Sequence, residues 1–215
     1  MTRSELINSI IKKNNYKTYL EIGVNNPSQP GWNFDSVGIE TKHGVDPADG
    51  VNATYKMESD EFFAKQIKMK YDIVFIDGLH IFEQAYRDIV NSLKWLNENG
   101  TIVVHDCNPK HEITQRRVKV VSAWHGDVWK AILKLRMEDP NISIFTVNTD
   151  EGCAVIKKGS QKPFETKEDK DSIYNFPFFK RNRKEILNLI SVRKFRKIMG
   201  LDSWFKSTMN KLLRK

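Results

Sequence analysis

The sequence predicts an α/β fold in which a doubly wound, mostly parallel sheet closes with an antiparallel hairpin, followed by a C-terminal helical extension. Four short apolar segments alternate with helical patterns and carry an acid at or near their ends: TYLEIGV, KHGVD, YDIVFID and TIVVHD. Strands that are apolar on both faces are typical of a parallel sheet covered on each side by crossover helices. The later segments ISIFTVN and GCAVIKK are separated by only a short turn, which predicts a hairpin.

The helices between the strands are predicted from the spacing of apolar residues. The clearest one covers about residues 82–96, where apolar side chains recur three and four positions apart. Asn99-Gly100 is expected to end this helix in a turn, and another helix is expected over about residues 121–137.

The last part of the chain has a different composition. From about residue 159 it becomes a charged linker, an aromatic cluster, YNFPFF, and two basic amphipathic helices divided at Gly200. We therefore divide the chain into a domain over residues 1–158 and a basic, helical extension over residues 159–215. The apolar stripe of the last helix suits a peripheral contact with an anionic membrane, or packing on the protein body or on a second subunit as a homodimer.

The charge distribution bears on the class of partner. The net charge is +8, yet residues 1–156 carry 18 Lys and Arg against 21 Asp and Glu, whereas residues 157–215 carry 17 against 6. The predicted α/β domain lacks the basic surface of a nucleic-acid enzyme, so no nucleic-acid partner is expected. Cys107 and Cys153 form no metal or disulfide motif, and no long apolar run is present. A cytoplasmic location is expected.

Polar residues at the predicted strand ends indicate a ligand site. The four strands are expected to end at Gly23–Val24, Asp46, Asp77 and Asp106, and Glu21 lies just before the first end. Because ligands bind outside the carboxyl ends of strands in such sheets, these side chains are expected to surround one pocket. The alternative for each acid is that it caps the following helix or opens a turn.

The turn after the first strand excludes one class of ligand. A pyrophosphate-binding GxGxxG motif is absent, because the turn after the first strand supplies only one of the three glycines, Gly23. An acid two residues earlier, Glu21, would repel a pyrophosphate but attract a cation such as the ammonium or sulfonium of S-adenosylmethionine. Asp46 lies where an acid would accept hydrogen bonds from a ribose diol.

The segments YLEIGV, GVDP, YDIVFIDGLHIFEQAYRDI and GTIVVHD resemble the successive motifs of the class I S-adenosylmethionine (SAM) dependent methyltransferases. The likeness is to the branch of small methyltransferase domains associated with sugar and surface-glycan modification. It covers residues 18–107, the hairpin extends it to about residue 158, and FIDGLH is its most specific part. It implies a Rossmann-like fold with SAM as the cofactor.

The resemblance also implies roles for individual residues. By position, Glu21 and Gly23 would border the methionine moiety of SAM, and Asp46 would border the ribose. Met57, Glu58 and Ser59 would lie near the adenine, and Asp77 beside the transferable methyl. One departure is that the glycine-rich turn expected after the first strand is replaced by residues 25–30, with Gly31 arriving late.

The candidates for catalysis are Asp77, His80 and Asp106. His80 follows a strand end by three residues, and a neutral imidazole suits removal of a proton from an acceptor hydroxyl. The alternative is that His80 caps the next helix.

Some related sugar methyltransferases hold a divalent metal with acids at the places of Asp77 and Asp106, where Asn108 or His105 could assist. A Mg²⁺ ion is not favoured, because it prefers more oxygen ligands than this sequence supplies. Trp124 and Trp129 could either stack on the acceptor or lie in a helix core.

We therefore expect a SAM-dependent O-methyltransferase that acts on a small acceptor: a sugar, a nucleotide-linked sugar or a glycan precursor. Two alternatives belong to other classes. One is a nicotinamide-dependent oxidoreductase, against which the missing glycines argue. The other is a non-enzymatic module that binds a membrane or nucleic acid through its basic tail.

Overall fold

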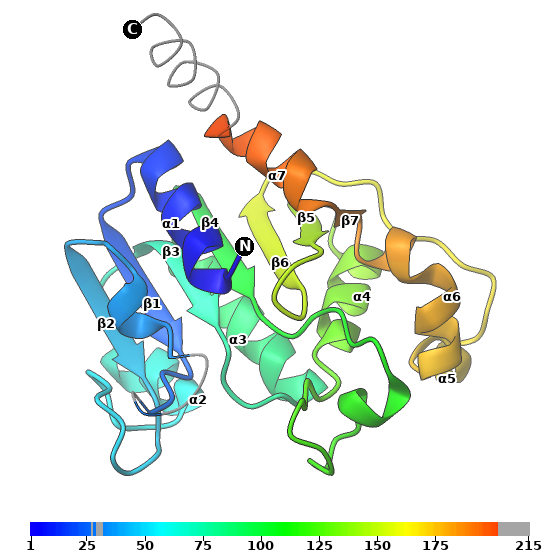
Figure 1. Cartoon of the computed structure of the whole chain (residues 1–215), viewed down its shortest axis with the longest axis horizontal. Helices are drawn as coiled ribbons and strands as arrows, with labels where there is room; N and C mark the ends of the chain where they lie inside the picture. Colours follow the sequence, from blue (N-terminus) through cyan, green and yellow to red (C-terminus); the bar gives the residue numbers. More distant parts are fainter. Residues whose placement is uncertain (27, 29–31, 202–215) are drawn as a thin grey trace, which may run out of the picture.

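The computed structural model describes residues 1–26, 28 and 32–201, and these form an α/β structure around one sheet (Figure 1). The strand order in the described part is β2-β1-β3-β4-β6-β5-β7. The strands are β1 Thr18–Ile22, β2 Thr41–Val45, β3 Tyr71–Ile76, β4 Leu96–Val104, β5 Ile142–Val147, β6 Cys153–Lys158 and β7 Leu189–Ile190. The first four run parallel, and β6 is antiparallel to both β4 and β5. The predicted fold class is confirmed.

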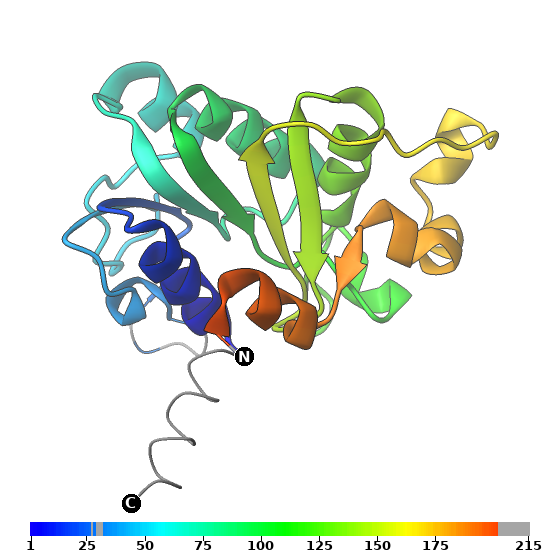
Figure 2. The same ribbon diagram turned by 90° about the horizontal axis from the view of Figure 1, so that it is seen from above.

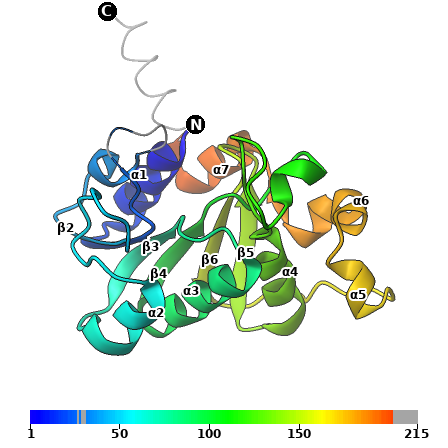
Figure 3. The same ribbon diagram turned by 90° about the horizontal axis from the view of Figure 1, so that it is seen from below.

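Helices cover both faces of the sheet. The α-helices of the described part are α1 Arg3–Asn14, α2 Ser59–Glu61, α3 Phe82–Lys94, α4 Trp129–Glu138, α5 Lys170–Ile173, α6 Phe176–Ile186 and α7 Val192–Met199. Phe34–Ser36 and Glu112–Gln115 form 3-10 helices, and Phe62–Gln66 forms a π-helix. Helices α1 and α7 lie side by side on one face (Figure 2), and α2, α3 and α4 lie on the other (Figure 3).

The alternation of side chains along β3 explains why both faces need cover. Ile73 and Phe75 belong to the core cluster under α1, and Val74 and Ile76 belong to the cluster under α3 and α4. All four are buried, so removing either helical layer would expose apolar surface to water.

Two predicted boundaries were wrong. Asn99-Gly100 lies inside β4, where the pairing with β3 shifts from Tyr71 opposite Leu96 to Ile73 opposite Thr101. The extra residues form a bulge, and a Cβ on Gly100 would lie 2.6 Å from Leu96 Cγ.

The helix expected from residue 121 begins only at Trp129. The preceding segment forms turns because Gly126 has a φ of +58° and because the Asp127 carboxylate accepts a hydrogen bond from the backbone N–H of Phe82 at 2.7 Å. This contact ties the turns to the start of α3.

The described part of the C-terminal segment packs on the sheet. Strand β7 pairs in parallel with β5, Phe179 packs on Trp129 with ring centroids 4.4 Å apart, and Phe195 of α7 is fully buried. The division of the chain at residue 158 stays a prediction, and the amphipathic helix predicted after Gly200 falls in residues 202–215, outside the described residues. Among the described helices, none has the length and apolar character needed to cross a membrane.

Replacing Phe195 by Ala is expected to lower the free energy of unfolding by about 3–5 kcal/mol, because it leaves a cavity in the core under α1 and α7. Ile198, on the same helix, is 42% exposed, so Ile198→Ala is the matched control and should change stability by less than about 0.5 kcal/mol. Urea unfolding of both variants measures the difference. Equal, small losses would contradict the account of α7 as part of the folded core.

Candidate active site

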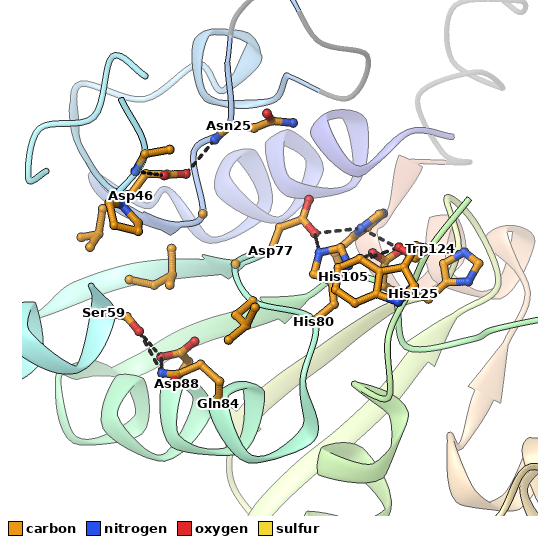
Figure 4. Close-up of a pocket in the computed structure, with 18 of the residues that line it drawn as sticks. Asn25, Asp46, Ser59, Asp77, His80, Gln84, Asp88, His105, Trp124 and His125 are labelled. Carbon is orange, nitrogen blue, oxygen red and sulfur yellow. Dashed lines mark hydrogen bonds and ion pairs between the residues drawn. The ribbon is translucent and has the colours of Figure 1, made fainter. Parts of the chain in front are cut away.

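A cavity of about 650 Å³ opens at the carboxyl ends of the parallel strands (Figure 4). Gly23, Asp46, Asp77 and Asp106, which follow β1, β2, β3 and β4, all contribute to its wall. Other lining residues used below are Arg3, Asn25, Glu58, Ser59, His80, Gln84, Asp88, His105, Lys119, Trp124, His125 and Glu151. The predicted convergence of strand ends is therefore present in the structure.

Gly23 allows the ends of β1 and β3 to approach each other closely. Its φ is +84°, and a Cβ there would lie 2.3 Å from the carbonyl oxygen of Asp77 and 2.5 Å from Gly78 Cα. Glycine is thus required by the protein's own backbone at this position, in addition to any space that a ligand needs. The same contact sets where the Asp77 side chain enters the cavity.

The Asp46 carboxylate holds two loops at one end of the cavity. One oxygen accepts hydrogen bonds from the backbone N–H groups of Val24 and Asn25, at 3.0 and 3.1 Å, and the other accepts from Ala48 at 2.9 Å. Asp46 is mostly buried but still borders the cavity. It therefore fixes the backbone of Asn25 in the wall.

A second polar cluster on this side is formed by Ser59 of α2 with Gln84 and Asp88 of α3. Ser59 donates a hydrogen bond to Asp88 at 2.6 Å, and Gln84 donates to both, each at 3.0 Å. Burial raises the pKa of Asp88 to about 6, although these hydrogen bonds oppose the shift. Sequence reasoning missed Gln84 and Asp88; the signal for Asp88 was an acid beside the apolar stripe of the predicted helix, next to Ile89.

His80 lies between the acids that follow β3 and β4. Its Nε2 is 3.3 Å from Asp77 Oδ1, and its Nδ1 is 3.2 Å from Asp106 Oδ2. Burial acts to lower the pKa of His80, but the two carboxylates outweigh it and hold the pKa above the usual value. The three predicted catalytic residues are therefore in direct contact, with ligand atoms that all lie within 4.8 Å of one another.

His105 and Arg3 supply further positive charge to the same acids. His105 Nδ1 is 3.2 Å from both Asp77 Oδ1 and Asp106 Oδ1, and Arg3 Nη1 is 2.7 Å from Asp77 Oδ2. Asp150, in the hairpin turn, contacts His105 Nε2 at 3.4 Å and Arg3 Nη2 at 3.1 Å.

These contacts shift the pKa values of the paired groups. Burial opposes the charged form of each, yet the carboxylates raise the pKa of His105 well above its usual value, and the cations hold the pKa values of Asp77 and Asp150 well below theirs. We call Arg3, Asp77, His80, His105, Asp106 and Asp150 the charge network.

The loop before α4 covers the charge network. The Trp124 ring is stacked on the His80 ring, with centroids 5.0 Å apart and planes inclined by 23°. A Cβ on Gly126 would lie 1.6 Å from the carbonyl oxygen of His80, so only glycine permits this approach. The two tryptophans thus differ: Trp124 lines the cavity, whereas Trp129 is buried in the core.

His125 adds an imidazole to the cavity wall. Its Nε2 is 3.0 Å from Glu151 Oε2, and its Nδ1 is buried with no hydrogen-bond partner in the described part of the chain. A ligand in the cavity could supply that partner.

Besides Trp129, three residues named from the sequence lie away from the cavity wall: Glu21, Met57 and Asn108. Glu21 is buried beside Tyr19, on the α1 side of the sheet, where it accepts hydrogen bonds from the Tyr19 hydroxyl and from Asn33; burial raises its pKa to about 8. Met57 packs against the apolar core, and Asn108 is fully buried and donates to Asn148 at 3.0 Å.

Replacing Gly23 by Ala is expected to destabilise the protein and weaken cofactor binding, because the new methyl group would overlap the Asp77 carbonyl and require a left-handed backbone. Gly159→Ala is the matched control, since its Cβ would meet only Ser143 Cβ at 3.6 Å. Thermal unfolding and calorimetry with SAM measure both effects. Indistinguishable behaviour of the two variants would contradict the close approach of β1 and β3.

Comparisons with known proteins agree with the fold and with part of the sequence. Residues 12–107 match a protein family described as a methyltransferase domain. A comparison with curated protein sequences gave no match.

Two solved structures illustrate the structural likeness. An SAH-bound methyltransferase from Podospora anserina matches with 16% identity over 74% of this chain and 78% of that chain, and a TM-score of 0.54. An O-methyltransferase from Bacillus cereus in complex with SAH matches with 12% identity over 73% of this chain and 80% of that chain, and a TM-score of 0.52. At these identities the two matches show a shared fold.

The chain thus has the class I methyltransferase fold, and the region that carries the first four strands matches a methyltransferase domain in sequence. The match of residues 12–107 agrees with the expectation of a methyltransferase, and the two solved structures that share the fold hold SAH.

Proposed function

We propose that this protein methylates a hydroxyl oxygen of a sugar, a nucleotide-linked sugar or a glycan precursor in the cytoplasm. The observation that carries the proposal is the position of His80, between Asp77 and Asp106 and under Trp124, in the wall of the cavity at the strand ends. An imidazole held by two carboxylates is a base placed where an acceptor hydroxyl would meet a methyl donor.

The charges of the cavity fit a cationic cofactor. Its wall contains four cationic side chains, Arg3, Lys119 and the imidazoliums of His80 and His105, against six acids: Asp46, Glu58, Asp77, Asp88, Asp106 and Glu151. When bound, S-adenosylmethionine supplies an electrophilic methyl group on a sulfonium. The acidic wall favours a positively charged ligand and disfavours a pyrophosphate, which argues against the nicotinamide-dependent alternative.

Within the cavity we assign the cofactor to the side of Gly23, Asp46, Glu58 and Ser59. Asp46 would contact the ribose, with Asn25 beside it, and Ser59 with Asp88 would border the adenine. Glu21 acts indirectly in this proposal, since it lies behind the wall and fixes Tyr19 and Asn33. Asp77 joins this side to the charge network.

The acceptor side is formed by His80, Trp124 and His125. In this proposal Nδ1 of His80 donates to the Trp124 carbonyl at 3.2 Å, and the 3.3 Å contact between Nε2 and Asp77 opens when the acceptor binds. The freed Nε2 then accepts the hydroxyl proton, and Asp77 and Asp106 stabilise the imidazolium that results. The polar side chains and the Trp124 ring support a sugar as acceptor, since a sugar offers hydroxyl groups at its edge and C–H groups to an aromatic ring.

A magnesium ion does not fit these residues well. The carboxylate Oδ2 of Asp77 already accepts from Arg3 at 2.7 Å, and His105 contacts Oδ1 of both Asp77 and Asp106 at 3.2 Å. Mg²⁺ prefers near-octahedral oxygen ligands, and here cationic side chains occupy the two acids that would bind it. No step of the proposal uses a metal ion.

The test is release of S-adenosylhomocysteine in the presence of a panel of nucleotide sugars, with and without a chelator. We expect turnover with at least one acceptor and equal rates in both conditions. Binding of SAM without turnover on any sugar would overturn the sugar assignment, and failure to bind SAM at millimolar concentration would overturn the whole proposal. A loss of turnover in the chelator would contradict the metal-independent step.

Replacing His80 by Ala is expected to lower kcat by about 10²–10⁴-fold while the affinity for SAM changes less than about twofold. In the wild type, activity should rise with pH through the raised pKa of His80, because the ring must lose its proton to act as a base. His111→Ala is the control, as His111 is exposed and outside the cavity wall. An unchanged kcat or a flat pH profile would contradict this role.

A further inference from the structure

A second cavity lies on the C-terminal part of the described chain and shares no lining residue with the first. It has a volume of about 630 Å³ and is bordered by the last turn of α4, the linker near residue 163, the end of α6, β7 and the start of α7, elements that can be located in Figure 1. Four cationic side chains and two acids line it: Arg136, Lys162, Lys184, Lys194, Glu165 and Glu185.

The four cations have no counter-ion in the described part of the chain. None of them lies within 4.0 Å of a carboxylate oxygen there, although the surface elsewhere forms many such pairs, for example Lys134 with Glu138 and Arg181 with Glu168. Repulsion among unpaired like charges raises the free energy of the folded state. Such an excess of positive charge around a cavity indicates an anionic ligand.

Arg136 is the strongest sign of a ligand. Its Nη1 donates to Gln161 Oε1 at 2.6 Å and to the Lys162 carbonyl at 3.1 Å, but its Nε is buried with no hydrogen-bond partner. Burial lowers the pKa of Arg136, and no carboxylate offsets that cost. An oxyanion that accepts a hydrogen bond from this guanidinium would stabilise its buried charge.

The rest of the cavity limits the kind of anion. Phe164, Leu189 and Ile190 supply apolar surface to the lining, while Lys162, Lys184 and Lys194 are exposed. Glu165 and Glu185 would repel an extended polyanion. A compact phosphate group next to Arg136 would contact the lysines around it and would be small enough to avoid the two glutamates.

We propose that this cavity is a binding site for a phosphate group, carried by a soluble phosphate ester or by a lipid headgroup. Arg136 is the anchoring residue, and Lys184 and Lys194 attract and hold the phosphate from α6 and α7. The site is separate from the charge network, so the proposal does not depend on the identity of the methyl acceptor.

The experiment uses the full chain and two probes at low ionic strength. Calorimetry with inorganic phosphate tests the soluble source, and flotation with phosphatidylcholine vesicles, with and without phosphatidylglycerol, tests the headgroup. The variant Lys184→Ala/Lys194→Ala removes two exposed cations of the cavity. Lys180→Ala/Lys197→Ala is the control, because it also removes one lysine from α6 and one from α7. Both of these lysines lie outside the cavity lining.

We expect at least one probe to bind the wild type, with affinity reduced at least about tenfold in Lys184→Ala/Lys194→Ala and less than about twofold in the control. Reduced binding of inorganic phosphate in the Lys184→Ala/Lys194→Ala variant identifies a soluble phosphate as the source, and reduced binding of the vesicles alone identifies a headgroup. Arg136→Gln should weaken binding of the same probe, with its folding checked by circular dichroism. Binding of neither probe, or equal loss in the two double variants, would overturn the proposal.

Discussion

The pairing of Asp77 and Asp106 with positive side chains is the constraint on which the site depends. These acids follow adjacent parallel strands, so their charges face each other at one edge of the sheet. Two carboxylates so placed would repel each other in a partly buried cavity. Arg3, His80 and His105 remove that repulsion, and each contacts at least one of the two acids within 3.3 Å. The two acids are thereby held close together without an unpaired charge.

The charge network also ties distant parts of the chain to the cavity. Arg3 stands in the first turn of α1, whose start is fixed by a capping box between Thr2 and Glu5, and it contacts Asp150 in the hairpin turn. The same hairpin adds the antiparallel strands to the sheet, and β7 extends that sheet from the C-terminal segment. The packing of α1 and of the hairpin turn therefore bears on the geometry around Asp77.

The strand ends and the fold class could be predicted from the sequence because apolar segments ending in acids are a local pattern. The face of the sheet on which Glu21 lies could not be predicted, because β1 is buried on both faces and its pattern does not distinguish them. Glu21 lies with Tyr19, behind the cavity. The contacts of Arg3 with Asp150, and of Gly126 with His80, join residues far apart in sequence. Nothing in the sequence around these residues indicates such contacts, whereas Asp88 could have been suspected from its place beside the apolar stripe of the predicted helix.

The charge network is tested most directly by following the titration of the His80 and His105 rings in the full chain by NMR. The account expects midpoints above the ordinary value of about 6.5 for both rings, because each imidazolium is held by carboxylates. Asp150→Asn should lower the midpoint of His105 more than that of His80, since Asp150 contacts His105 at 3.4 Å. Midpoints at or below the ordinary value in the wild type would contradict the account.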